Sequence, residues 1–221
     1  MEGKIIGAGF QKTGTSTLRE ALKILGYKVK DTTPRALIPI LRGNTSRIKK
    51  ILEGYDAMED TPWFFYYKEL DHMYPGSKFI LTIRDEESWY RSVSKHIGNL
   101  KAAHHEWIYG RGKSIPAENK ENTIEVYSHH NREVLKYFEN RPDDLLVLDF
   151  TKGDSWDKLC KFLGKEVPEI SLPHYNKTSE TEELKKSTRY KVRQLRHRMK
   201  NNLKIFYITL RGWWPEQAKN K

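Results

Sequence analysis

The residues best suited to chemistry form the stretch GAGFQKTGTSTL at positions 7–18, which combines glycines, hydroxyl side chains and a single lysine. A short apolar run at residues 4–8 precedes the glycine-rich part, and a helix-forming run at residues 16–25 follows it. A strand, a glycine-containing loop and a helix N-terminus together make a cradle in which backbone N–H groups and the helix dipole attract an anion. The stretch therefore predicts a phosphate-binding loop.

The position of the lysine separates this loop from that of the nucleoside triphosphatases. Their pattern, G-x-x-x-x-G-K-[ST], aligns with Gly9 to Ser16 but meets Thr15 where the lysine is required. The lysine of this loop, Lys12, stands three positions earlier. Because a displaced cation reaches a different oxygen, the loop indicates a different transferred group.

A second stretch, LTIRDEESWYRS at positions 81–92, begins in an apolar run that is typical of a buried strand. This strand delivers Arg84 at its end, and Ser92 follows eight residues later, about two helical turns on. A guanidinium is a planar fork that suits a phosphate group. The stretch therefore predicts a second anion contact.

Strand-like and helix-like segments alternate along the chain, which indicates an α/β fold with a parallel sheet flanked by helices. The expected strands are residues 4–8, 27–30, 55–59, 78–83 and 144–149. The expected helices are residues 16–25, 34–41, 46–52, 63–73, 86–97, 118–138 and 155–163, with a long amphipathic helix in the tail. Since ligands bind at the carboxyl ends of parallel strands, we expect the loop, Asp60, Arg84 and Asp149 on one rim.

The two motifs in this order resemble the sulfotransferases that use 3′-phosphoadenosine-5′-phosphosulfate (PAPS). The first sulfotransferase motif, K-[ST]-G-T-[ST], is matched by residues 12–16, and the second, an arginine followed eight residues later by serine, by Arg84 and Ser92. A branch of small sulfotransferase-like proteins also carries D-x-P after a strand and a late P-H-x-N, matched here by residues 60–62 and 173–176. The resemblance covers about residues 4–177 and implies a P-loop-type fold.

The resemblance implies a division of labour among the matched residues. Lys12 would stabilise the leaving group at the bridging oxygen between phosphate and sulfate. Arg84 and Ser92 would hold the 3′-phosphate, and no metal ion would be needed. The residues expected to bind PAPS are Gln11, Lys12, Thr13, Gly14, Thr15, Ser16, Thr17, Arg84 and Ser92.

Transfer to a hydroxyl or amine also needs a general base, for which the family offers no single residue type. Asp60, after the strand at residues 55–59, is the first choice. It could equally be an N-cap of the helix at residues 63–73. The alternative bases are Glu59, His96, His104 and His105.

Other polar and aromatic residues carry weaker signals. Trp89 and Tyr90 could stack on adenine, but neighbouring aromatic residues on a helix usually divide between core and surface, so core packing is expected instead. Phe150 and Trp156 are further candidates for an adenine contact. His129 and His130 are expected to be solvated. The acceptor stays unidentified, and its wall is expected from residues 31–73 and 97–120, which include Trp63, Phe64, Phe65, Tyr66, Trp107 and Tyr109. A late basic residue for the 3′-phosphate would be Lys177, Lys185 or Arg189.

The net charge of +11 is concentrated at the end of the chain. Residues 177–221 hold 13 Lys and Arg against 4 Asp and Glu, a net of +9, which leaves +2 for the rest. A domain at residues 1–177 with a basic helical extension at 178–221 is therefore expected, and no specific nucleic-acid partner. A single cysteine excludes an internal disulfide and fits the reducing cytoplasm, and we expect no secretory signal and no membrane span.

The tail helix allows three arrangements. We expect its apolar stripe to pack on the domain. The alternatives are that it pairs with a second copy in a homodimer or lies on an anionic membrane as a peripheral contact. Two other functions also remain open: a small-molecule or nucleoside kinase with a deviant loop, and a nucleotide-binding module without catalysis whose basic tail docks on a partner.

Overall fold

The computed structural model describes residues 3–173 and 188–212, and for residues 188–198 it describes the helical backbone alone. The boundary expected after residue 177 lies outside these residues and stays a prediction. So do the P-H-x-N match beyond Pro173 and the side chains of Lys177, Lys185 and Arg189.

Five strands form one parallel sheet in the order β2-β3-β1-β4-β5. The sheet confirms the expected fold class, and each strand lies inside the range expected from the sequence. The strands are β1 (Ile5–Gly7), β2 (Val29–Lys30), β3 (Ala57–Met58), β4 (Lys78–Thr82) and β5 (Leu145–Leu148). Because all pairs are parallel, the segments that follow β1, β3, β4 and β5 leave the sheet at the same edge, as expected.

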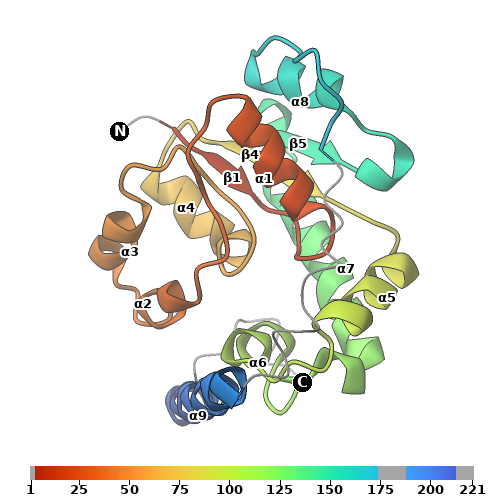
Figure 1. The fold of residues 1–221 in the computed structure, drawn as a ribbon. Helices are drawn as coiled ribbons and strands as arrows, with labels where there is room; N and C mark the ends of the chain where they lie inside the picture. Colours follow the sequence, from red (N-terminus) through yellow and green to blue (C-terminus); the bar gives the residue numbers. More distant parts are fainter. Residues whose placement is uncertain (1–2, 174–187, 213–221) are drawn as a thin grey trace. The chain divides into compact units, whose positions relative to one another are not determined.

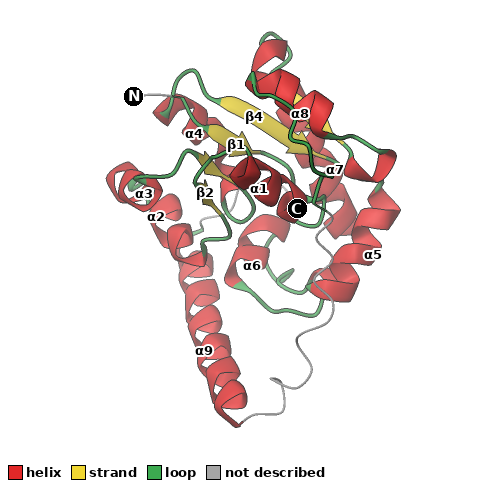
Figure 2. Cartoon of the chain, turned by 45° about the horizontal axis from the view of Figure 1, so that its top comes forward, coloured by secondary structure: helices red, strands yellow, loops and turns green. Residues whose placement is uncertain are grey.

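The cartoon shows the helices in red and the strands of the sheet in yellow (Figure 2). The helices are α1 (Thr15–Ile24), α2 (Leu37–Leu41), α3 (Thr45–Leu52), α4 (Tyr67–Met73), α5 (Glu86–His96), α6 (Ala103–Tyr109), α7 (Lys120–Tyr137), α8 (Trp156–Leu163) and α9 (Thr188–Arg211). Short 3-10 helices, among them Trp63–Tyr66 and Phe150–Lys152, join several of them. The sequence did not lead us to expect α6.

The chain divides into two compact units. The first comprises Met1–Ser92 and Tyr127–Pro173, and the second comprises Val93–Val126 and His174–Lys221. The first unit holds the whole sheet, with both of the expected anion-binding stretches.

The core of the first unit lies on both faces of the sheet (Figure 1). On one face, strand side chains such as Ile80 and Leu148 pack with Leu22 of α1 and Trp156 of α8. On the other face, Phe79 of β4 packs against Phe138, with ring centroids 4.6 Å apart. The alternation along β4 thus buries neighbouring residues on opposite faces, as expected for a central strand.

The second unit contains α6 and α9, which pack side by side (Figure 1). Ile208 of α9 is fully buried, and Asn201 donates a hydrogen bond to the carbonyl of Lys101 over 3.4 Å. The apolar stripe of α9 lies on a different face and is exposed in the described part, at Met199, Leu203, Phe206 and Leu210. The expected packing of the tail helix on the domain stays a prediction. No helix within residues 3–173 and 188–212 is both long and apolar enough to cross a bilayer.

Candidate active site

Hydrogen bonds of Thr13 connect the loop between β1 and α1 to the sheet. The Thr13 N–H and hydroxyl both donate to the Phe10 carbonyl, over 3.3 and 2.5 Å. The same hydroxyl lies 2.6 Å from the hydroxyl of Thr82 at the end of β4. The Thr13 side chain is buried, and its hydrogen bonds hold the loop in shape. Its expected part in donor binding stays a prediction.

Phe10 anchors the loop in an aromatic cluster. Its ring centroid lies 4.5 Å from that of Phe64, 5.6 Å from Trp89, 5.7 Å from Tyr127 and 5.2 Å from His130. Rings at such distances and tilted angles pack favourably. The cluster fixes the start of the loop against the rest of the first unit.

His130 is part of this cluster, so the expectation that it is solvated is wrong. It is buried, with Nε2 2.8 Å from the Ala8 carbonyl. Burial lowers the pKa of His130 to about 4, against the opposing effect of the Ala8 hydrogen bond. The neutral imidazole therefore donates Nε2–H to the backbone at the start of the loop.

Gln11 is held on both sides, although it is expected to bind the donor. Its carbonyl accepts a hydrogen bond from the Trp89 indole over 2.8 Å, and its side-chain oxygen accepts one from the Thr61 hydroxyl over 3.2 Å. Trp89 is buried and stacks on Tyr127, with centroids 4.1 Å apart. Trp89 is thus a core residue, as expected, and it supports the loop through Gln11.

The N-terminus of α1 is open. Its N-cap residue is Gly14, at φ 106°, and no side chain caps the helix there. A Cβ at Gly14 would lie 2.6 Å from Cδ2 of Phe150, so only glycine fits. The first N–H groups of a helix have no partner within it, which leaves them for an anion. Thr15 and Thr17 are buried in this turn and Ser16 is half-buried.

Asp60 faces this helix start. Its Oδ2 accepts a hydrogen bond from the Thr15 hydroxyl over 3.3 Å, and its Oδ1 accepts one from the Thr61 N–H over 2.6 Å. Its backbone is left-handed, at φ 64°. The Trp63 and Phe64 N–H groups donate to the carbonyl of Asp60 and not to its carboxylate. The side-chain N-cap is therefore wrong, and the carboxylate is directed to the loop.

Lys12 lies in the electrostatic field of both other charged candidates. Burial lowers the pKa of the Lys12 ammonium, Asp60 raises it and Arg84 lowers it, and the net direction is downward. Its backbone is also left-handed, at φ 70°. A non-glycine residue in this region costs energy and marks a position that the surroundings impose. The structure thus brings together Lys12, Asp60 and Arg84, which come from three separate segments.

Arg84 is fixed through its backbone. Its N–H donates to the Tyr127 hydroxyl over 2.9 Å, and that hydroxyl donates to the Arg84 carbonyl over 2.7 Å. In the part of the chain that the structure describes, the buried Nε of Arg84 has no hydrogen-bond partner. A buried donor without a partner is costly, and it is satisfied when an anion binds. Ser92, the other half of the motif, is half-buried on α5.

Glu59, an alternative base, is fully buried. Its Oε1 lies 3.4 Å from the Arg19 guanidinium, and its Oε2 has no partner among the described residues. Burial raises the pKa of Glu59 well above its usual value, Asp60 adds to this, and Arg19 opposes it. A fully buried carboxyl beside Arg19 is less accessible to an acceptor than the carboxylate of Asp60 at the loop.

The remaining candidate residues belong to the second unit or have a partner of their own. His96, His104 and His105 belong to the second unit, and His105 is buried, which lowers its pKa to about 4. Asp149 lies on the expected rim but binds its own turn, where Oδ1 accepts from the Thr151 N–H over 2.9 Å.

The aromatic candidates are mostly core residues. Trp156 belongs to the core beneath α1 and donates its indole N–H to the Ile170 carbonyl over 2.8 Å. Phe150 covers Gly14 at the loop. The aromatic residues expected along an acceptor wall are buried in their own units, apart from the half-buried Phe65: Trp63, Phe64, Tyr66, Trp107 and Tyr109.

Sequence reasoning missed three supports of the site. Tyr127 positions Arg84, Thr82 pairs with Thr13, and Arg19 pairs with Glu59. Their only local signal is that Thr82 ends a buried strand opposite the loop. Across residues 3–173 and 188–212, no three His, Cys, Asp or Glu residues gather in a set that could hold a metal ion.

The arrangement offers two cations and a carboxylate beside an open helix N-terminus. The cations and the backbone N–H groups favour a ligand with negative charge. The carboxylate can accept a proton from a hydroxyl that approaches the same point. The site therefore combines anion binding with a proton acceptor.

Comparison with known proteins agrees with these features. The sulfotransferase domain family matches residues 4–181. A relative described as "Ava biosynthesis cluster protein M" from Aspergillus versicolor is 25% identical over 211 residues, which cover 77% of this chain and 80% of that protein. The family match spans the whole of the described sheet and both anion-binding stretches, and the chain belongs to the sulfotransferase family.

Proposed function

We propose that this sulfotransferase moves the sulfuryl group from PAPS to a hydroxyl, or with less support to an amine, of an acceptor. The single observation that carries the proposal is the meeting of Lys12, Asp60 and Arg84 around the open start of α1. The pKa of Lys12 responds to both of the other groups, and Asp60 is bonded to Thr15 in the first turn of the helix.

The donor's two anionic ends fit two separate parts of the site. The uncapped N–H groups at Gly14 to Thr17 suit the 5′-phosphosulfate, with the half-buried hydroxyl of Ser16 in the same turn. The unpartnered Nε of Arg84 suits the 3′-phosphate, and Ser92 contributes a hydroxyl. Gln11 and Thr13 act by holding the loop in shape.

The transfer step needs only residues of this chain. The acceptor oxygen forms a bond to sulfur while the bond from sulfur to the bridging oxygen breaks, in line. The acceptor proton passes to the Asp60 carboxylate. The negative charge that appears on the phosphate is stabilised by the Lys12 ammonium, so the electron pair of the broken bond stays with the leaving nucleotide.

The family match favours this reaction over the kinase and the non-catalytic module, since it extends through both motifs. The proposal places the protein in the cytoplasm, where PAPS would be its donor and a small molecule, glycan or lipid its acceptor. The curated relative is described as a biosynthesis cluster protein, which fits a small-molecule acceptor.

Binding of the desulfated donor, 3′-phosphoadenosine-5′-phosphate, tests the donor half of the proposal without an acceptor. Isothermal titration without Mg²⁺ should give saturable binding that Arg84→Ala weakens by about 10- to 100-fold, the loss expected for charge-assisted hydrogen bonds. Arg91→Ala is the matched control, because Arg91 is exposed and bonded to Ser88 over 2.8 Å. Binding of ATP with Mg²⁺ alone would refute the proposal.

A further inference from the structure

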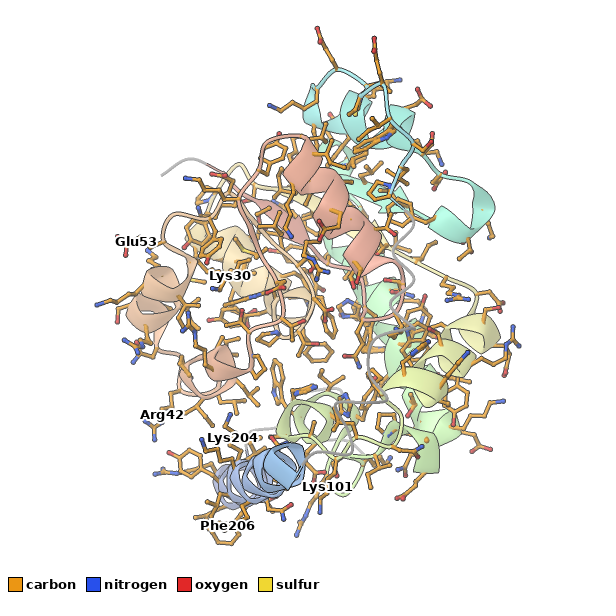
Figure 3. All side chains as sticks on the ribbon, in the orientation of Figure 1. Lys30, Arg42, Glu53, Lys101, Lys204 and Phe206 are labelled. Carbon is orange, nitrogen blue, oxygen red and sulfur yellow. The ribbon has the colours of Figure 1, made fainter. Side chains whose placement is uncertain are left out.

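The exposed face of α9 is the strongest feature that the proposed reaction does not use. Four large apolar side chains are largely exposed: Met199 at 60%, Leu203 at 68%, Phe206 at 66% and Leu210 at 68%. Their spacings of four, three and four residues place them within about 60° of the helix circumference. Figure 3 shows Phe206 projecting from α9 on the side away from α6.

Packing within the second unit uses the opposite face of α9. The fully buried Ile208 lies about 180° from Met199 around the helix, and Asn201 at about 200° bonds the Lys101 carbonyl. The stripe is therefore not the face by which α9 is held on its own unit. In the sequence the same spacing continues upstream through Val192 and Leu195, so the apolar periodicity runs along most of the helix.

Positive charge runs along one edge of this stripe. Lys200, Lys204 and Arg211 fall about 100–140° from Met199, all on the same flank. Figure 3 shows Lys204 on a different side of α9 from Phe206. In the sequence, Arg189, Arg193 and Arg196 have helical positions about 60–120° from Met199, and no Asp or Glu occurs between positions 184 and 215. In the part with described side chains, the helix thus pairs an apolar face with a basic edge.

We propose that this face of α9 docks the protein on an anionic lipid surface, lying in the plane of the membrane. An amphipathic helix with a polar face rich in Lys and Arg binds such a surface by burying its apolar face among the headgroups and attracting anionic lipids. Phe206 and its apolar neighbours would enter the membrane, and Lys200, Lys204 and Arg211 would face lipid phosphates. The proposal does not depend on which acceptor the enzyme uses.

A second copy of the chain fits this face less well. The four side chains present on the order of 500 Å² of surface, whereas each partner in a stable interface buries roughly 800 Å². Two such helices would also bring together basic edges that no acidic residue of the helix offsets. An anionic lipid surface complements both the apolar stripe and the positive charge of the helix.

The test uses the full chain and lipid vesicles. Co-sedimentation should find the protein on phosphatidylcholine vesicles with about 30 mol% phosphatidylserine, much less on phosphatidylcholine alone, and less as salt is raised. The double variant Leu203→Ser, Phe206→Ser should lower the partition coefficient at least 10-fold, and Asn202→Ser, an exposed polar position off the stripe, should leave it unchanged.

A matched pair of double variants tests the contribution of positive charge to lipid binding. Lys200→Glu with Arg211→Glu should weaken binding at least 10-fold. Lys49→Glu with Lys50→Glu, an equal change of net charge at exposed positions of α3, should have little effect. Equal losses for both pairs would overturn the assignment to α9, as would binding that ignores the stripe variant. A dimer found by analytical ultracentrifugation, and abolished by the stripe variant, would assign the face to a second copy instead.

Discussion

The backbone strain at Lys12 and the charge of its side chain are two separate properties, and two substitutions can tell them apart. Lys12 lies at φ 70°, where a residue with a Cβ costs about 1–2 kcal/mol and glycine costs nothing. Lys12→Ala keeps this strain and Lys12→Gly removes it, while both remove the ammonium. Glycine also gives the unfolded chain more conformational entropy, which lowers the free energy of unfolding by roughly 0.5–1 kcal/mol. The free energy of unfolding of Lys12→Gly should therefore exceed that of Lys12→Ala by about 0.5–1 kcal/mol.

The assay compares melting temperature and activity for the same two proteins. A difference of this size should raise the melting temperature of Lys12→Gly above that of Lys12→Ala by about 1–4 °C. Both variants should lose sulfuryl transfer by about 100-fold or more, since the leaving group loses its cation. If Lys12→Ala proves the more stable variant, the left-handed conformation of the loop is wrong. If either variant keeps most of its activity, the role of the ammonium is wrong.

Three further changes probe the same loop. Asparagine tolerates the left-handed backbone of Asp60, so Asp60→Asn should leave the melting temperature unchanged. In a steady-state assay it should lower the rate of sulfuryl transfer by about 100- to 10,000-fold. An unchanged rate would show that Asp60 is not the general base. Gly14→Ala should destabilise the protein by at least about 2 kcal/mol in urea titration, because its Cβ would lie 2.6 Å from Phe150, and Phe150→Ala should restore part of the loss. The pKa of His130 is lowered to about 4, so its contribution to stability is complete above pH 6.5 and is lost as pH falls through 4. His130→Gln should therefore remove up to about 3 kcal/mol of acid destabilisation between pH 7 and 4, measured by urea titration at each pH, and an unchanged pH profile would contradict the buried neutral state.

The strands and the anion-binding loop were predictable because their signals are local. Apolar, β-branched runs bounded by turn residues identify β4 and β5, and the glycines and hydroxyls of residues 7–18 identify the loop. The position of Asp60 also followed from its place after a strand, because parallel strands end at one edge. Elements whose signal lies within their own residues can therefore be predicted from the sequence alone.

Long-range partners could not be predicted from local patterns. His130 and the Ala8 carbonyl are 122 residues apart, so no local pattern indicated that this histidine is buried. The helix α6 begins after Ala102, which provides no side-chain cap, and so carried no start signal. For α9 the amphipathic pattern was correct, but periodicity does not say which face packs, and in the described part the face of Ile208 and Asn201 is the buried one.

The most direct test of the central claim is a thermal-shift titration of the wild-type protein and Arg84→Ala with 3′-phosphoadenosine-5′-phosphate, against ATP with Mg²⁺. A ligand that binds only the folded state raises the melting temperature. We predict a concentration-dependent rise with the 3′-phosphorylated nucleotide, without Mg²⁺, that is largely lost in Arg84→Ala. A rise with ATP and Mg²⁺ alone, or an equal rise in both proteins, would contradict the assignment of Lys12, Asp60 and Arg84 to a PAPS site.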